Sequence, residues 1–310
     1  MKKKKNKLNN LDNKSWLVAT KSVYFQNESD TLNFDTELIE EFKKWVETKR
    51  KDAQELFGQK IQSVINSKPP ARDKLKRQHP ATFAESDINR LINFFTKKGE
   101  WVLDPFLGVG STLISCLQTG RNGCGIELTE KWINLAKNRI KKWLNLFNRD
   151  VKINIIKGDA RNEIKKLRQK FQFIVTSPPY WNILKKDKDH KVLAERIEKG
   201  LATKYSKSNR DLGNIESYEE FLEQLGTVFG QCRGVLDKGR YLCVIVSDFR
   251  HKSKFYSFHS DLAKIIEDHG FSLEGITILV QNSKTLYPYG IPYAFVSNII
   301  HQNILIFRNR

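Results

Sequence analysis

Residues 171–180 have the sequence FQFIVTSPPY. The first five residues are apolar or β-branched with one exception, which is typical of a buried parallel strand. Pro178 and Pro179 then end the strand, because proline lacks an N–H group and has a fixed φ. Open α/β sheets bind their ligands at the carboxyl ends of the strands. We therefore expect a rigid loop here that presents the Ser177 hydroxyl, the Pro178 carbonyl and the Tyr180 ring together.

These three groups suit a planar ring that carries an exocyclic amine. The Ser177 hydroxyl and the Pro178 carbonyl can accept hydrogen bonds from the two amino protons, while the Tyr180 ring can stack on the ring face. Taken alone, a Pro-Pro-Tyr segment is more often an ordinary turn that ends a strand. The segments that precede it in the chain decide between the two interpretations.

A glycine-rich turn lies earlier in the chain. The apolar residues 101–103 predict a short buried strand that continues into residues 104–112, DPFLGVGST, and a helical pattern follows at 113–118. Gly108 and Gly110 allow the backbone to approach a bound molecule, and the start of the helix offers free N–H groups. No Gly-Lys-Ser/Thr follows, so this is not a phosphate loop. The sequence predicts a strand, turn and helix that cradle a ligand.

Acidic residues end the next two predicted strands. Residues 123–126 lead to Glu127, whose spacing from Asp104 matches the acidic residue that binds ribose hydroxyls in the dinucleotide-binding fold. Residues 151–156 lead to Asp159, whose carboxylate could accept a hydrogen bond from an adenine amino group. Either acid alone is more often a helix cap or a solvated turn residue. Two acids at the ends of successive strands favour a nucleoside site.

The rest of the chain continues this alternation of strands and helices. Helical patterns cover 87–92, with Ser86 as the expected N-cap, 130–147, 217–236 and 259–269, and strand patterns cover 241–246, 273–280 and 303–307. The alternation predicts an α/β fold with a doubly wound, mostly parallel sheet. No helical pattern separates the last two strands, so we expect them to pair antiparallel at one edge.

Composition limits the partners and the location of the protein. The chain has 310 residues, with 54 Lys and Arg against 35 Asp and Glu, a formal charge of +19. Such an excess favours a polyanion such as nucleic acid, or less readily an anionic membrane surface. No apolar run is long enough to span a membrane, and the lysine-rich start resembles no secretory signal. Four scattered cysteines without metal-type spacing predict reduced core residues in a cytoplasmic protein.

Taken together, these segments resemble those of the amino-group DNA methyltransferases that use S-adenosylmethionine, the N4-cytosine and N6-adenine family. The likeness covers about residues 79–308. Residues 104–110 resemble the cofactor motif of the family, and residues 176–180 resemble its catalytic motif. The segment 79–83, HPATF, resembles the part that packs over the methionine end of the cofactor. The resemblance implies a Rossmann-like class I methyltransferase fold, and the order of motifs resembles the unpermuted branch.

The resemblance also implies roles for individual residues. Catalysis falls to Ser177, Pro178, Pro179 and Tyr180. Asp104, Phe106, Gly108 and Gly110 are expected to hold the methionine part of the cofactor, Glu127 the ribose and Asp159 the adenine. The further cofactor-binding residues are His79, Phe83, Pro105, Ser111, Thr112, Leu128, Ala160 and Thr176. No metal is implied, because the methyl donor carries its own positive charge, and S-adenosylhomocysteine is the product.

The residue before Pro-Pro-Tyr bears on the target base. Family members with serine there are mostly cytosine-N4 enzymes, whereas Asp or Asn usually accompanies adenine-N6, so Ser177 predicts cytosine N4 in double-stranded DNA. Adenine N6, an amino group of RNA, and a methylase-like DNA-binding subunit that needs a partner remain alternatives. The protein is expected to serve restriction-modification, with a cognate restriction endonuclease as a candidate partner. The oligomeric state and the recognised DNA sequence are not predictable from these residues.

Target recognition has no separate block of sequence. We divide the chain into residues 1–78, a basic and partly helical extension, and residues 79–310, the catalytic domain. The extension, a long basic loop at 181–215 and the segment 250–256 are expected to share the contacts with DNA.

Two positions depart from the family pattern. Ser111 stands where threonine is frequent, and Gln302 stands where an acidic residue is common, and we expect neither to affect the central chemistry.

Overall fold

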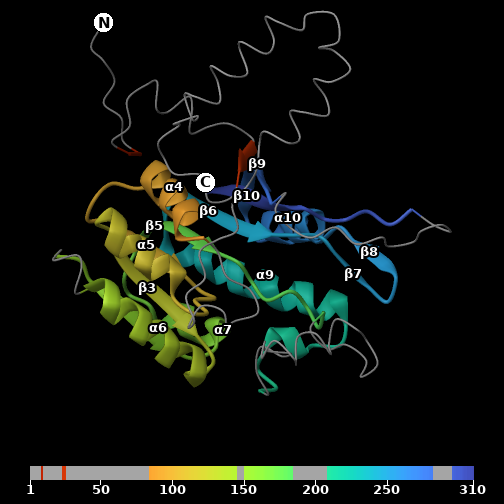
Figure 1. Ribbon diagram of the computed structural model, residues 1–310, viewed down its shortest axis with the longest axis horizontal. Helices are drawn as coiled ribbons and strands as arrows, with labels where there is room; N and C mark the ends of the chain where they lie inside the picture. Colours follow the sequence, from red (N-terminus) through yellow and green to blue (C-terminus); the bar gives the residue numbers. More distant parts are fainter. Residues whose placement is uncertain (1–7, 10–22, 26–83, 145–149, 184–207, 282–294) are drawn as a thin grey trace, which may run out of the picture.

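A central sheet with helices on both faces forms the body of the protein (Figure 1). This computed structural model describes residues 8–9, 23–25, 84–144, 150–183, 208–281 and 295–310. The sheet has eight strands: β1 (Val23–Phe25), β2 (Trp101–Asp104), β3 (Asn122–Glu127), β4 (Ile153–Lys157), β5 (Phe171–Thr176), β6 (Leu236–Val246), β9 (Phe271–Val280) and β10 (His301–Asn309). A separate hairpin consists of β7 (Phe249–His251) and β8 (Lys254–Tyr256).

Helices connect the strands. They are α4 (Glu85–Phe95), α5 (Ser111–Thr119), α6 (Glu130–Leu144), α7 (Ala160–Glu163), α9 (Tyr218–Val235) and α10 (Phe258–Asp268), with short 3-10 turns η2 (Ile164–Lys166) and η3 (Leu212–Asn214). No helix among the described residues is both long and apolar enough to cross a membrane.

The order of strands confirms the predicted fold class. It is β1-β9-β10-β6-β5-β2-β3-β4, and the neighbouring pairs from β6 to β4 are all parallel. The two last strands pair antiparallel as expected, and β10 also pairs antiparallel with β6, so it lies between β6 and β9. The short β1, which the sequence did not predict, pairs parallel with β9 as the outermost strand. The result is a Rossmann-like, doubly wound sheet.

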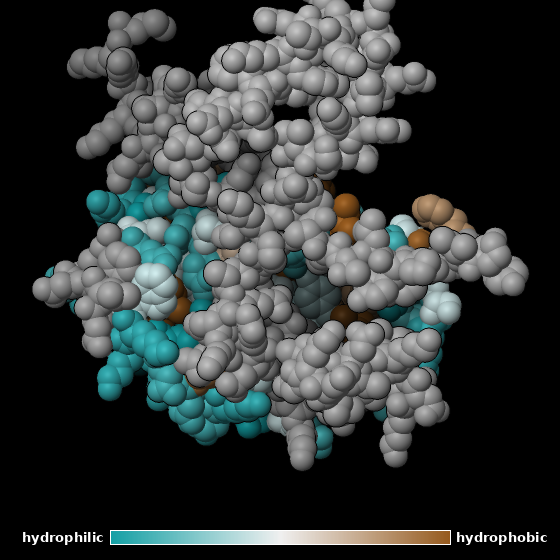
Figure 2. All heavy atoms as spheres, viewed as in Figure 1, coloured by the Kyte–Doolittle hydropathy of each residue, from teal (hydrophilic) through white to brown (hydrophobic). Residues whose placement is uncertain are grey.

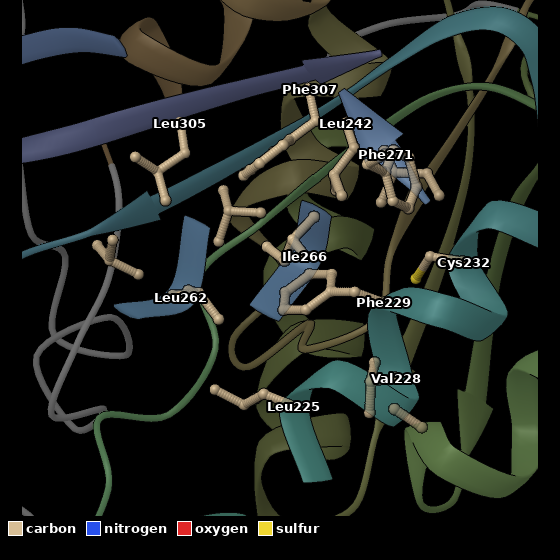
Figure 3. Packing of buried hydrophobic residues seen from close by; sticks show 14 of the residues in the cluster. Leu225, Val228, Phe229, Cys232, Leu242, Leu262, Ile266, Phe271, Leu305 and Phe307 are labelled. Atoms are coloured by element: carbon tan, nitrogen blue, oxygen red, sulfur yellow. The ribbon is translucent and has the colours of Figure 1, made fainter. Parts of the chain in front are cut away.

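Each face of the sheet buries its own apolar cluster. On one face Ile88, Ile92 and Phe95 of α4 pack against Phe173 of β5 and Ile245 of β6. On the other face α9 and α10 cover the sheet, and Figure 3 shows Phe229 and Ile266 beside Leu242, Leu305 and Phe307. Burial of each such side chain stabilises the fold by about 1.5–3 kcal/mol. The central strands are therefore held from both sides, which fixes their carboxyl ends.

Several local predictions are settled by these elements. All four cysteines are buried and unbridged, as predicted for core residues. The predicted N-cap at Ser86 is wrong, since α4 begins at Glu85 and its N-cap is Ala84. The chain also passes directly from α9 into β6. Of the predicted N-terminal extension, residues 1–7, 10–22 and 26–78 lie outside the described residues.

Candidate active site

The carboxyl ends of the parallel strands surround one pocket. β2, β3 and β5 end at Asp104, Glu127 and Thr176, and the turns that follow them line a space of about 1030 Å³, including its open mouth. The glycine-rich turn and the Ser177–Tyr180 turn therefore line one shared cavity.

Asp104 ties the two turns together from behind the pocket wall. Its side chain accepts hydrogen bonds from the Thr112 hydroxyl at 2.6 Å, the Thr176 hydroxyl at 2.6 Å and the Phe106 N–H at 3.0 Å. Burial raises the pKa of the Asp104 carboxyl, and these three hydrogen bonds act in the opposite direction. The carboxylate is 1% exposed and does not line the pocket. Its contacts are those of a structural support for the turns.

The two glycines of the turn have different roles. Gly108 lines the pocket with a φ of 55°, and its N–H donates to Oε2 of Glu127 at 2.9 Å. Gly110 has a φ of 82°, and a Cβ at this position would lie 3.0 Å from Cβ of Ala136 in α6. Gly108 therefore leaves room for a ligand, whereas Gly110 allows α6 to pack against the turn.

A buried ion pair holds the turn from its other side. Arg139 of α6 is 3% exposed, and its guanidinium donates to the Val109 carbonyl at 2.5 Å and to Glu85 at 2.5 Å. Glu85 also accepts a hydrogen bond from the Ser111 hydroxyl at 2.9 Å. Ser111 lines the pocket. The first residue of α4 is thereby fastened to the start of α5, and the shape of the cofactor turn depends on both helices.

Glu127 faces the pocket from the end of β3. Its Oε1 accepts the Thr129 N–H at 2.8 Å, and its Oε2 accepts the Gly108 N–H. Burial raises the pKa of Glu127 to about 7, the two backbone hydrogen bonds oppose this shift, and the nearby Asp211 adds to it. A carboxylate held in this way has lone pairs left for hydroxyl donors, and its charge responds to pH near neutrality.

Asp159 lies at the end of the loop after β4, where it caps α7. It accepts hydrogen bonds from the backbone N–H of Arg161 at 3.0 Å and from the Arg161 guanidinium, with 2.6 Å between Oδ2 and Nη2. The same guanidinium donates to the Arg210 carbonyl at 2.9 Å and to Gln224 at 2.7 Å. Asp159 and Arg210 both line the pocket, so Arg161 links two of its walls.

The Tyr180 ring is held rigidly behind Ser177. Its hydroxyl accepts hydrogen bonds from the Ser247 N–H at 2.9 Å and from the Gln302 amide at 3.3 Å. The ring is 8% exposed and packs beside Phe249 and Phe258. Burial raises the pKa of Tyr180, and its hydrogen bonds, including one with Ser177, oppose the shift. The aromatic side chain therefore has a fixed position in the pocket wall.

The structure brings most of the predicted site residues together. Those that line the pocket are Pro105, Phe106, Gly108, Ser111, Glu127, Leu128, Asp159, Ala160, Ser177, Pro178, Pro179 and Tyr180. Asp104, Gly110, Thr112 and Thr176 do not line it, although all four lie in or beside the turns that form its walls. His79 and Phe83 lie outside the described residues, as do 184–207 of the predicted loop.

Two parts of the pocket escaped the sequence analysis. Residues 210–212 close one side, with Asp211 and Leu212 buried. They belong to the irregular segment 181–215, and an acidic residue that caps η3 there was the available signal. Gln302 also lines the pocket and bonds to Tyr180. Its amide therefore contacts the turn at 177–180, and the expectation that this departure leaves the central chemistry unaffected stays a prediction.

Comparison with known proteins gives several relatives in DNA methylation. Over 94 residues the chain is 37% identical to the type II methyltransferase M.MthZI of Methanothermobacter thermautotrophicus, covering 30% of this chain and 25% of that protein. M.Cfr9I of Citrobacter freundii is 30% identical over 119 residues, which cover 38% and 35%. M.MjaII of Methanocaldococcus jannaschii is 25% identical over 236 residues, which cover 68% and 44%. The chain thus spans less than half the length of these relatives.

Comparison with solved structures gives weaker similarities. TrmN from Thermus thermophilus superposes with a TM-score of 0.43 at 13% identity, over 73% of this chain and 48% of that one. A putative rRNA methylase from Clostridium thermocellum gives a TM-score of 0.43 at 13% identity, over 72% and 95%.

The sequence profile of one family covers most of the chain. It is described as a DNA methylase profile and matches residues 1–138 and 171–307, which include both turns of the pocket. With the two motifs in one cavity and with this match along its length, the chain belongs to the N6/N4 family of DNA methylases.

Proposed function

We propose that this protein transfers a methyl group from S-adenosylmethionine to the exocyclic N4 of cytosine in double-stranded DNA. The observation that carries the proposal is the shared pocket, which is lined by the glycine-rich turn, by Glu127 and by the Ser177–Tyr180 turn. One wall offers a nucleoside site, and the other offers acceptors for an amine. Methyl transfer between a nucleoside cofactor and an aminated ring needs both walls.

The residues present fit the cofactor. Glu127 has two backbone donors and keeps acceptor capacity for two ribose hydroxyls, while the Gly108 backbone leaves room beside it. Asp159, fixed by Arg161, would accept from the adenine amino group. When bound, the cofactor supplies an electrophilic methyl group on a positively charged sulfur. No further cofactor chemistry enters the proposal.

The chain itself would position the amine. The amino nitrogen of cytosine is a poor nucleophile, because its lone pair is delocalised into the ring. Hydrogen bonds from its two protons to the Ser177 hydroxyl and the Pro178 carbonyl would favour a pyramidal nitrogen and orient its lone pair toward the glycine-rich turn. The Tyr180 ring, held by Ser247 and Gln302, would support the face of the base. Rotation of the base out of the duplex is needed to reach this depth.

The choice of cytosine rests on Ser177 in place of Asp or Asn. A hydroxyl gives a neutral acceptor that suits an amine on either pyrimidine or purine, so adenine N6 is the second candidate. We further propose that the protein works in the cytoplasm as the modification partner of a restriction endonuclease. Its support is limited to the class of its relatives, two of which are named type II methyltransferases.

The test uses the purified chain with isotopically labelled S-adenosylmethionine, in parallel reactions with duplex DNA of mixed sequence and with RNA. Nucleoside mass spectrometry of the digested product should find labelled N4-methylcytosine. Labelled N6-methyladenine would mean that adenine is the target base, while the assignment of methyl transfer to an amino group would stand. Label found in RNA and not in DNA would mean that RNA is the substrate. Cofactor binding without any transfer, by the chain alone, would show a methylase-like subunit that needs a partner and would overturn the proposal.

A further inference from the structure

The β7–β8 hairpin stands apart from the main sheet. Its strands pair with each other only, with Phe249 opposite Tyr256, Arg250 opposite Phe255 and His251 opposite Lys254. In Figure 1 it lies at the right-hand end of the molecule, away from α6. The connecting turn consists of Lys252 and Ser253. The hairpin follows β6 directly, so it begins at the same sheet edge as the pocket.

The turn has an unusual backbone for its residues. Lys252 has a φ of 46° and Ser253 a φ of 66°, as in the two-residue hairpin turns that normally contain Asn-Gly or Gly-Gly. Positive φ is costly for residues with a β-carbon, and such strain concentrates at functional positions. Glycine or asparagine at 252 would suit the backbone better. A lysine that occupies this position in spite of the strain suggests a use for its side chain.

The exposed side chains of the hairpin are basic and aromatic. Lys252 and Lys254 are exposed, and Phe255 is 42% exposed. Arg250 braces the turn, donating to the Ser253 carbonyl at 3.3 Å, and its guanidinium lies 5.3 Å from the centre of the Phe255 ring. Lys254 interacts electrostatically with Glu219, an exposed residue in the first turn of α9. The hairpin itself contains no acidic residue.

The base of the hairpin packs on the catalytic turn. The Phe249 ring lies 6.4 Å from Tyr180, and Trp181, the next residue in the chain, lies 4.7 Å from His251 and 5.4 Å from Tyr256, measured between ring centroids. Trp181 is 6% exposed. The hairpin therefore has a fixed position relative to Ser177–Tyr180, and so does a molecule that is bound to it.

We propose that the β7–β8 hairpin is a DNA-contacting element on the target side of the pocket. Lys252 and Lys254 would bind backbone phosphates, and Phe255 would make an apolar contact with a sugar or a base edge. This inference rests on the proposed function, because it assumes that duplex DNA is the substrate. It assigns contact with DNA to one specific surface, the β7–β8 hairpin. Trp181 sets the position of this hairpin relative to the Ser177–Tyr180 turn.

The strained turn supplies a matched pair of variants. Lys252→Gly removes a charge and relieves strain, whereas Ser253→Gly relieves strain and keeps every charge. Both should melt at or above the temperature of the wild type. Only Lys252→Gly should weaken binding to a fluorescent DNA duplex, by roughly twofold to fivefold as for an exposed ion pair. It should also reduce the slope of log Kd against log salt by about 0.9.

Two further variants separate the roles of the side chains. Phe255→Ala should weaken DNA binding without changing the salt slope, because it removes an uncharged contact. Lys142→Ala serves as the control for charge, since Lys142 is an exposed lysine of α6, at the lower left of Figure 1, where the described surface in Figure 2 is hydrophilic. It should leave both affinity and slope unchanged.

The outcomes distinguish this inference from the proposed function. A wild-type protein that methylates DNA, with a Lys252→Gly variant of equal affinity and equal salt slope, would overturn the hairpin assignment alone. An equal loss of affinity in Lys142→Ala would also overturn it, because binding would then depend on net charge rather than on this surface. A wild-type protein that binds S-adenosylhomocysteine but no DNA would overturn both proposals.

Discussion

The Thr176 hydroxyl at the end of β5 donates a hydrogen bond to the Asp104 carboxylate at the end of β2, with 2.6 Å between Oγ1 and Oδ1. The two strands are neighbours in the sheet, and the turns after them form the two principal walls of the pocket. The carboxylate is buried, so this bond is shielded from water. The spacing between the glycine-rich turn and the Ser177–Tyr180 turn is thus fixed by a direct contact.

Asp104→Asn should therefore affect both stability and cofactor binding. The amide keeps the shape but cannot accept at both terminal atoms. Depending on its orientation, either the Thr112 hydroxyl or both the Thr176 hydroxyl and the Phe106 N–H lose their acceptor. We expect the free energy of unfolding to fall by about 1–3 kcal/mol, measured by urea denaturation. Calorimetry should show weaker binding of S-adenosylhomocysteine. Thr176→Val, which removes one donor only, should have the smaller effect; equal affinity in Asp104→Asn and wild type would contradict this role.

Ser177→Ala should separate transfer from cofactor binding. The side chain lines the pocket and is expected to contact the amine but not the cofactor, so the rate of methyl transfer should fall while the Kd for S-adenosylhomocysteine stays near that of the wild type. Loss of one positioned hydrogen-bonding group costs on the order of 10²-fold in comparable sites. An equal loss of binding and transfer would mean that Ser177 belongs to the cofactor site. Ser260→Ala, at an exposed position of α10 that does not line the pocket, is the matched control.

Cofactor affinity should depend on pH through Glu127. Burial raises its pKa to about 7, so the carboxyl is largely protonated below neutrality and cannot then accept both ribose hydroxyls. The Kd for S-adenosylhomocysteine should be constant near pH 8 and should rise as the pH falls, by up to about tenfold per unit below the pKa. In Glu127→Gln binding should be weaker at pH 8 and the pH profile flat. An unchanged profile in that variant would assign the titration to another group.

Two glycines with the same backbone conformation offer a test of local packing. Gly99 and Gly110 both have a φ of 82°, but a Cβ at 99 would meet nothing within 4 Å, whereas one at 110 would meet Ala136. Gly99→Ala should lower the free energy of unfolding by about 1–2 kcal/mol from backbone strain alone. Gly110→Ala should lower it further and weaken cofactor binding, because α6 or the turn must move. Equal effects would show that the Ala136 contact is accommodated freely.

The sheet and the pocket were largely predictable because their signals are local. Buried parallel strands give continuous apolar runs such as 171–175, and proline and glycine mark the turns that follow them. Acidic residues at two successive strand ends then meet at one edge as a consequence of parallel pairing. The meeting of Ser177, Glu127 and Asp159 at one edge of the sheet could therefore be predicted without any knowledge of long-range contacts.

The features that were missed depend on tertiary contacts. The sequence pattern predicts Ser86 as the N-cap of α4, whereas Glu85 already belongs to the helix, where it binds Ser111 and Arg139. Gln302 reaches Tyr180 only because β10 inserts between β6 and β9. The hairpin turn at 252–253 carries none of the usual glycine or asparagine signals. In each case a distant partner determines the local conformation.

The bond from the Arg161 guanidinium to the Arg210 carbonyl sets a practical boundary for protein engineering. Residues 210–212 belong in sequence to the segment assigned to target handling, yet they form part of the wall beside Asp159. A chimaera that imports the corresponding segment of a relative to change the methylated sequence should therefore end its graft before Arg210. Grafts that extend further would also replace part of the pocket wall beside Asp159. A change in cofactor binding could then not be told apart from a change in DNA specificity.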